Sequence, residues 1–240
     1  MKKLLIAFFV FISVNSFAQR WETIKGNGQV KKENRTVSNF TALSSQGAMN
    51  VQIAYGNSDN IVIEADENLL PYIETSVENG KLSIRSKKNV NLKPKSKIVV
   101  RVSMTKITAL QQSGSGNMNG DGAFTNDGKT DISLSGSGNI KLSFDTFKDI
   151  ELAVSGSGNI EMKGNSANSI IASVSGSGNI DCSSISSNEA QAKISGSGNI
   201  KVYAKNSLDS KISGSGNVFY KGSPSNVNNK TSGSGKVIKM

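Results

Sequence analysis

Histidine is absent from the 240 residues of this chain, and cysteine occurs once, as Cys182. Without histidine, the Ser-His-Asp and Cys-His forms of catalysis and histidine-ligated zinc are excluded. A single cysteine also excludes an internal disulfide framework. The stability of the fold must therefore come from packing, and we expect Cys182 to be an inert thiol in that packed core.

Long apolar runs are also scarce, and the clearest one lies at the start of the chain. Lys2 and Lys3 precede an apolar run from Leu4 to Phe11, and small residues follow at Ser16-Phe17-Ala18. This pattern predicts a secretory signal peptide over residues 1–18. The run is too short for a membrane anchor. We therefore expect an exported protein of the periplasm, outer-membrane surface or extracellular space, with no membrane span after signal cleavage.

Acidic residues are outnumbered by basic ones. The chain has 28 Lys and Arg against 18 Asp and Glu, and removing Lys2 and Lys3 with the signal leaves 26 against 18, a net charge near +8. Such an excess favours association with anionic polymers such as lipopolysaccharide or acidic glycans. Export makes nucleic acid an unexpected partner, and nothing in the sequence indicates a cofactor.

Gly-Ser-Gly-Asn is the most informative pattern that is present. Six copies of Ser-Gly-Ser-Gly-Asn and one variant follow one another along the chain, and their first residues are 22, 20, 20, 20, 18 and 19 positions apart. A period near 20 indicates a solenoid built from stacked repeats. The copies begin at Ser113, Ser135, Ser155, Ser175, Ser195, Ser213 and Ser232, the last with Lys236 in place of asparagine.

Within one period the sequence alternates as strands do. Apolar residues occupy every second position in Ile140-Lys-Leu-Ser-Phe144 and again in Ile150-Glu-Leu-Ala-Val154. One apolar face per repeat must be covered, and stacking the repeats covers it. We predict an all-β fold, a right-handed parallel β-helix with coils of about 20 residues. Its interior would carry one row of stacked side chains: Ile140, Ile160, Ile180 and Ile200.

The motif itself is predicted to be a structural corner. Glycine tolerates the backbone angles of a tight corner and leaves room for the coil above, and stacked asparagines can pass hydrogen bonds from coil to coil. Seven copies without helices are not the single glycine loop of a phosphate-binding site. The corner residues are Gly114, Gly116, Asn117, Gly136, Gly138, Asn139, Gly156, Gly158, Asn159, Gly176, Gly178, Asn179, Gly196, Gly198, Asn199, Gly214, Gly216 and Asn217.

The first half of the chain is less regular. Residues 47–53 resemble a degraded copy of the corner and its following strand. Residues 67–74 interrupt the strand pattern, and Asp66 is a candidate cap for a helix that Pro71 limits to a turn or two. No linker separates the halves, so we expect one β-helix body over residues 19–240, less regular over 19–112 and regular over 113–240.

One segment concentrates positive charge. Between Lys81 and Lys106 no acidic residue occurs. Strand alternation would place several of these cations on one surface, which would suit an anionic glycan, lipopolysaccharide or phospholipid headgroups. The alternative is a solvated face whose lysines discourage edge pairing. The candidate polyanion-binding residues are Lys81, Arg85, Lys87, Lys88, Lys93, Lys95, Lys97 and Arg101.

Catalysis has to be considered, because parallel β-helices include polysaccharide lyases and hydrolases. Such chemistry needs acid and base groups that converge on one bond. The carboxylates of the repeats are scattered over different turns, which favours solvated positions, so no catalytic residue or metal site is predicted. They are Asp145, Asp149, Glu151, Glu161 and Asp181.

The serial corners and several N-terminal segments together resemble the auto-transporter adhesin head family, also called the GIN domain family, of exported Gram-negative proteins. The N-terminal segments are Gly26-Asn-Gly28, Val37-Ser-Asn-Phe40, Gly47 to Ile53, Glu64 to Glu74 and Leu82-Ser-Ile-Arg85. The resemblance implies a right-handed β-helix at the cell envelope and supplies no catalytic residues. We expect a non-catalytic, adhesin-like protein that binds or scaffolds an envelope glycan, lipopolysaccharide or another envelope protein. The alternatives are a periplasmic assembly scaffold that acts through the rod ends and a carbohydrate-active β-helix enzyme.

Overall fold

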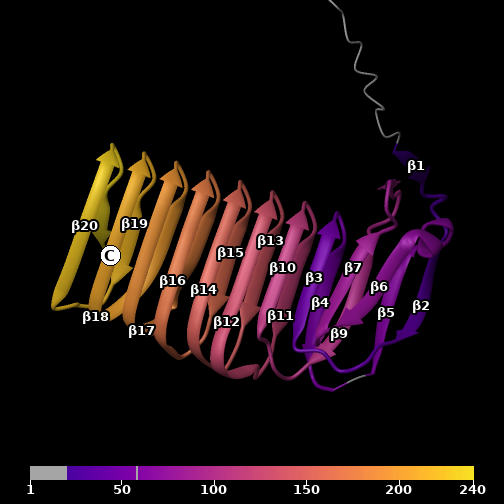
Figure 1. Cartoon of the computed structure of the whole chain (residues 1–240), viewed down its shortest axis with the longest axis horizontal. Coiled ribbons are helices and arrows are strands. Elements are labelled where there is room, and N and C mark those ends of the chain that lie inside the picture. The colour runs from indigo at the N-terminus through magenta and orange to yellow at the C-terminus, as the bar shows by residue number, and fades with distance from the viewer. Residues whose placement is uncertain (1–20, 58) are drawn as a thin grey trace, which may run out of the picture.

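The computed structural model of the chain describes residues 21–57 and 59–240, so the predicted signal peptide over residues 1–18 lies outside the described residues. The described chain forms an elongated rod of stacked β-coils (Figure 1). The N-terminal strands build one end of the rod, and β20 and β21 form the other. Among residues 21–57 and 59–240 no helix has both the length and the apolar content that crossing a membrane requires.

The regular coils occupy the second half of the rod. Each coil crosses two main faces, joined by the Gly-Ser-Gly corner, and the longer strands also bend around an opposite corner. The strands are β10 (Ala109–Gly114), β11 (Asn117–Asp121), β12 (Thr125–Gly136), β13 (Asn139–Ser143), β14 (Thr146–Gly156), β15 (Asn159–Lys163), β16 (Ser166–Gly176), β17 (Asn179–Gly196), β18 (Asn199–Gly214), β19 (Val218–Lys221), β20 (Asn226–Gly233) and β21 (Val237–Lys239).

Parallel pairing between successive coils confirms the predicted interior row. Ile140 is in register with Ile160, and the same column continues through Ile180 to Ile200. All four side chains are buried. Ile171 lies outside the buried row of its strand: Ile170 and Ala172 are buried, and Ile171 is half-exposed. The two consecutive isoleucines made the alternation ambiguous there.

The corners follow the predicted steric logic. The first glycine of each motif has positive φ, as at Gly156 with φ +118°, a region that L side chains adopt rarely. The two residues after Gly156 are hydrogen-bonded to the preceding coil: the backbone N–H groups of Ser157 and Gly158 both donate to the Gly136 carbonyl at 3.0 Å. A Cβ on Gly158 would collide with the Gly138 carbonyl oxygen. The second glycine is therefore required by the coil beneath it.

The asparagines form the predicted ladder. Asn139 Nδ2 donates to Asn117 Oδ1 at 2.9 Å, Asn159 Nδ2 donates to Asn139 Oδ1 at 3.0 Å, and Asn179 Nδ2 donates to Asn159 Oδ1 at 2.8 Å. The ladder extends to Asn50, whose Oδ1 accepts from the Asn117 side chain at 3.1 Å. Each amide thus serves two coils at once.

The degraded copy at residues 47–53 is a true coil. β3 (Ala42–Gly47) and β4 (Asn50–Tyr55) pair in parallel with β10 and β11, with Gly47 in register with Gly114. On its other side this coil meets β7 (Lys81–Ser86) and β9 (Val99–Met104). Residues 60–104 therefore run back past the first coil before the regular coils begin.

The returning segment completes the N-terminal end of the rod. β2 (Val30–Thr36) pairs antiparallel with β5 (Asn60–Asp66), and β6 (Ile73–Glu78) pairs antiparallel with β7. β1 (Glu22–Lys25) and β8 (Val90–Lys93) make a separate two-stranded parallel sheet. This combination of antiparallel strands and a small second sheet forms the irregular N-terminal portion. The sequence predicted that this portion is irregular but did not predict how its strands pair.

A short 3₁₀ helix, η1 (Glu67–Tyr72), lies where a turn or two of helix was predicted. The predicted cap was wrong, because Asp66 makes no side-chain hydrogen bond to the helix. Its buried carboxylate instead accepts from the backbone N–H groups of Lys95 at 2.8 Å and Ser96 at 3.2 Å. Asp66 thus holds the loop between β8 and β9 through hydrogen bonds to its backbone.

Candidate anion-binding site

The eight candidate polyanion-binding residues do not share one surface. Five occupy β7, β8 and the loop after β8, two occupy the turn after β7, and one lies on β9, on the other main face. In chain order they are Lys81 and Arg85 on β7, Lys87 and Lys88 on the turn, Lys93 on β8, Lys95 and Lys97 in the loop, and Arg101 on β9.

Three of the eight line a cleft of about 850 Å³ at the N-terminal end of the rod. Arg85, Lys87 and Lys88 contribute to it, and Trp21 lines it with 64% of its surface exposed. The cleft lies between the β1–β8 sheet and the first glycine corners. Its apolar lining comes from Ala48, Met49, Val90, Leu92 and Ile98. The site therefore combines an apolar wall with cationic side chains.

The cations of the cleft differ in how far they are neutralised. Arg85 forms an ion pair with Glu74 at 3.2 Å. Lys87 Nζ lies 5.6 Å from the centre of the Tyr72 ring, a cation–π arrangement that leaves the charge in place. Lys88 is exposed and, among the described residues, forms no ion pair. Lys87 and Lys88 thus provide the unbalanced positive charge.

The remaining candidates lie elsewhere. Arg101 pairs with Glu64 at 2.9 Å on the other main face. Lys81 is in register with Glu78 across the β6–β7 hairpin. Lys93, Lys95 and Lys97 are exposed but do not line the cleft. The segment itself contains no acid, but Glu64 on β5 and Glu74 on β6 pair with two of its arginines.

Sequence reasoning did not connect Trp21 with the basic segment. The residues from Glu22 to Lys25 are in register with those from Val90 to Lys93, which carries Trp21 beside the turn that holds Lys87. Four residues pairing in parallel across a separation of about 68 positions leave no periodic signal.

The carboxylates considered for catalysis are engaged between coils. Hydrogen bonds from Asn168 and Ser169 lower the pKa of Asp149, and Lys141 and Lys163 lower the pKa of Glu161. Burial would raise the pKa of Asp181, but hydrogen bonds from Ser183 and Lys201 outweigh the effect of burial, so this pKa is lowered. Asp145 accepts from Asn165 at 3.2 Å, and Glu151 pairs with Lys129 at 2.6 Å. All five carboxylates are thus engaged in hydrogen bonds or ion pairs with neighbouring side chains.

No metal site arises from the side chains that the structure describes: among residues 21–57 and 59–240 no group of three or more Cys, Asp or Glu residues has a suitable arrangement. The Gly-Ser-Gly-Asn corners use their amides within the ladder, as described above. The cleft at the N-terminal end is therefore the candidate site that the predicted basic residues contribute to.

The fold is shared with solved structures from Bacteroides and Parabacteroides species. A protein from Bacteroides fragilis described as a "putative adhesin" matches with a TM-score of 0.84 at 21% identity, over 90% of this chain and 100% of that one. A "putative lipid binding protein" from Parabacteroides distasonis matches with 0.71 at 26% identity, over 91% and 100%. A "putative adhesin" from Parabacteroides merdae matches with 0.68 at 24%, over 91% and 99%.

No curated protein matches the sequence. The family described as "Putative auto-transporter adhesin, head GIN domain" matches residues 39–224. This range covers most of the chain, from the strand before the first corner to the turn after β19. The resemblance found in the motifs is therefore confirmed, and the chain belongs to the auto-transporter adhesin head, GIN domain family.

Proposed function

We propose that this protein is a non-catalytic, adhesin-like binding module of the cell envelope or cell surface. Family membership and the β-solenoid fold support an adhesin-like surface protein. The signal-peptide pattern of residues 1–18 supports export. All strands from β2 to β21 except β8 share one 19-stranded sheet, which supports residues 19–240 as one functional unit.

The ligand class that suits the cleft is an anionic amphiphile, of which lipopolysaccharide is the envelope example. The observation that carries this proposal is the accessible apolar surface of Trp21 and Leu92 beside the charges of Lys87 and Lys88. An acyl chain would cover apolar surface that water now meets, while phosphate groups would meet the lysines. The similar Parabacteroides distasonis protein, described as a "putative lipid binding protein", supports this assignment.

The test is binding of purified protein to lipopolysaccharide at 150 mM NaCl. The variant Arg85→Gln/Lys87→Gln/Lys88→Gln removes the cations of the cleft. Its control, Lys81→Gln/Lys93→Gln/Lys97→Gln, removes the same charge from the same segment outside the cleft. We expect at least a tenfold loss of affinity in the first variant and less than a threefold loss in the second. Equal losses would show that net charge alone drives binding and would refute the cleft.

A second experiment tests whether the cleft recognises the lipid part or the sugar part of lipopolysaccharide. Trp21→Ala should weaken binding of intact lipopolysaccharide and leave binding of its delipidated polysaccharide unchanged, since the exposed indole supplies apolar lining of the cleft. If Trp21→Ala weakens both equally, the cleft recognises the glycan and the amphiphile proposal is wrong.

The second candidate function, a scaffold that acts through the rod ends, rests on the last coil. β20 and β21 have no further coil stacked on them within the described chain, and Val227, Ile238 and Met240 are exposed there. Free strand edges can pair with other chains. Sedimentation across a wide range of protein concentrations tests this function: end-to-end assembly predicts oligomers, and a monomer throughout excludes it.

A further inference from the structure

Three lysines stand in register at the C-terminal end of the rod. Lys193 on β17 aligns with Lys211 on β18, and Lys211 aligns with Lys230 on β20. All three side chains are exposed. Adjacent parallel strands lie about 4.8 Å apart, so like charges here repeat at about that spacing along the rod axis. We call this column the lysine ladder.

The ladder departs from the charge pattern of the other coils. Several lysines of other coils pair with an acid of the neighbouring coil, as Lys141 does with Glu161 at 3.1 Å and Lys201 with Asp181 at 3.3 Å. Like charges facing each other on a sheet are unfavourable, and no ion pair to the ladder occurs in the described part of the chain. The same column in the preceding coils holds small residues: Ser133, Ala153 and Ser173.

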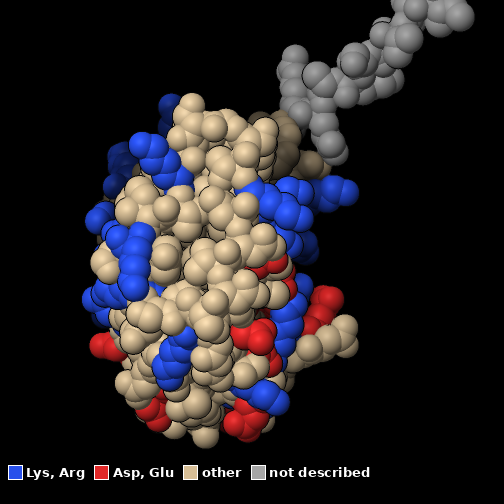
Figure 2. All heavy atoms as spheres, turned by 90° about the vertical axis from the view of Figure 1, so that its left-hand side faces the viewer, with Lys and Arg blue, Asp and Glu red and all other residues tan. Residues whose placement is uncertain are grey.

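The surroundings add to the positive charge. Residues 190–240 contain eight lysines and one acid, Asp209. Asp209 is exposed two residues before Lys211 and forms no ion pair with a described residue. Figure 2 looks onto this end of the rod and shows Lys and Arg side chains along both margins, with Asp and Glu side chains mainly in the lower half. The ladder thus lies within a cationic region that its single acid does not balance.

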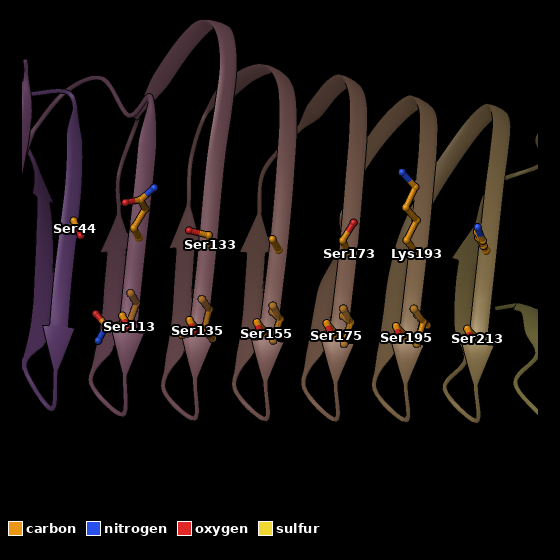
Figure 3. A pocket seen from close by; sticks show the side chains of 18 of the residues that line it. Ser44, Ser113, Ser133, Ser135, Ser155, Ser173, Ser175, Lys193, Ser195 and Ser213 are labelled. Carbon is orange, nitrogen blue, oxygen red and sulfur yellow. The ribbon is translucent and has the colours of Figure 1, made fainter. Parts of the chain in front are cut away.

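A groove of about 860 Å³ leads to the ladder along the same face. Its lining includes a row of serines that belong to successive corners and, at its C-terminal end, Lys193 and Lys211. Figure 3 shows the row from Ser113 to Ser213, with Lys193 in the neighbouring column, next to Ser173. The groove therefore runs across the strands and along the rod.

We propose that the lysine ladder binds a linear anionic polysaccharide laid along the rod axis. Its carboxylates or sulfates would meet Lys193, Lys211 and Lys230, and its hydroxyls would meet the serine row. The ladder repeats at about the spacing of neighbouring strands, close to the length of one sugar residue. A membrane surface fits less well, because the two columns carry no large apolar side chain to insert.

Lys193, Lys211 and Lys230 do not line the N-terminal cleft, although Ser113 lines both that cleft and the groove, so the test of the ladder can fail independently of the proposed function. Purified protein is titrated with dextran sulfate, polygalacturonate and neutral dextran at 150 mM NaCl. The variant Lys193→Gln/Lys211→Gln/Lys230→Gln should lose at least tenfold in affinity for both anionic polymers. The Lys→Arg triple, which restores the charge, should retain binding, and neutral dextran should not bind.

The control variant Lys25→Gln/Lys106→Gln/Lys148→Gln removes three exposed lysines from other faces. It should lose less than threefold, and the Arg85→Gln/Lys87→Gln/Lys88→Gln cleft variant should behave in the same way. Equal losses in ladder and control variants would overturn the proposal, because binding would then reflect net charge. Loss of binding to phosphatidylglycerol vesicles without loss of polysaccharide binding would overturn it in favour of a membrane surface. Unchanged circular dichroism and melting temperature establish that each variant is folded.

Discussion

Gly158 stacks on Gly138 so closely that a methyl group on Gly158 would lie against the Gly138 carbonyl oxygen and 2.6 Å from Cδ2 of Leu134. Both obstacles are fixed, since one is backbone and the other a core side chain. We predict that Gly158→Ala lowers the free energy of unfolding by about 1–3 kcal/mol or more, as overpacking does. Urea denaturation monitored by circular dichroism measures this loss.

Gly128→Ala is the matched control. A Cβ at Gly128 would meet only Asn126 Oδ1, at 3.8 Å. The same substitution should therefore change stability by less than about 0.5 kcal/mol, as at ordinary surface positions. A similar loss in both variants would mean that the coil spacing yields to a methyl group and that the corner glycines are not sterically required.

The asparagine ladder gives a second prediction. Asn159 donates one side-chain hydrogen bond to Asn139 and accepts one from Asn179. Asn159→Ala removes both and should cost about 1–3 kcal/mol, since each net bond contributes about 0.5–1.5 kcal/mol. Asn119→Ala, at an exposed position outside the ladder, serves as the control in the same urea experiment. If the two substitutions cost the same, the ladder adds no stability.

The regular coils could be predicted from sequence because every coil repeats the same local information. The alternation of apolar and polar residues places the side chains of Ile140 and Ile160 inside the coil. The spacing of the glycine corners sets the length of each coil. The lysine ladder was also accessible in this way. Lys193, Lys211 and Lys230 are 18 and 19 residues apart, the same spacings that separate the last three motifs.

The N-terminal end could not be predicted for the opposite reason. β3 lies between β7 and β10, so Leu43 has Leu82 on one side and Leu110 on the other. No repeat length relates these three residues, and antiparallel pairs such as β2 with β5 leave no motif. The cleft depends on this layout, because the pairing of β1 with β8 brings Trp21 into the lining of the same cleft as Lys87.

The single cysteine gives a third prediction. Cys182 is fully buried, its Sγ donates to the Lys201 carbonyl at 3.2 Å, and burial together with the charge of Asp181 raises its pKa to about 12. Because the thiolate is the reactive form, folded protein should not react with Ellman's reagent at pH 8. Unfolding in urea should release one thiol per chain. Ser157→Cys, at an exposed corner, is the reactive control. Rapid native labelling of Cys182 would place it outside the core.

Asp66 gives the last prediction, a dependence of stability on pH. Burial would raise the pKa of Asp66, but hydrogen bonds from Ser96 and Lys95 outweigh burial and hold it below its usual value. Because the folded protein then binds fewer protons than the unfolded chain, this stability is present above the unfolded-state pKa and is lost as pH falls through the folded-state pKa. Asp66→Asn should lower the melting temperature at pH 7 and flatten its fall between about pH 5 and pH 2. Asp59→Asn, at an exposed aspartate, should leave both unchanged. An Asp66→Asn protein whose melting temperature falls with acid as steeply as the parent's would show that Asp66 does not anchor the β8–β9 loop through its charge.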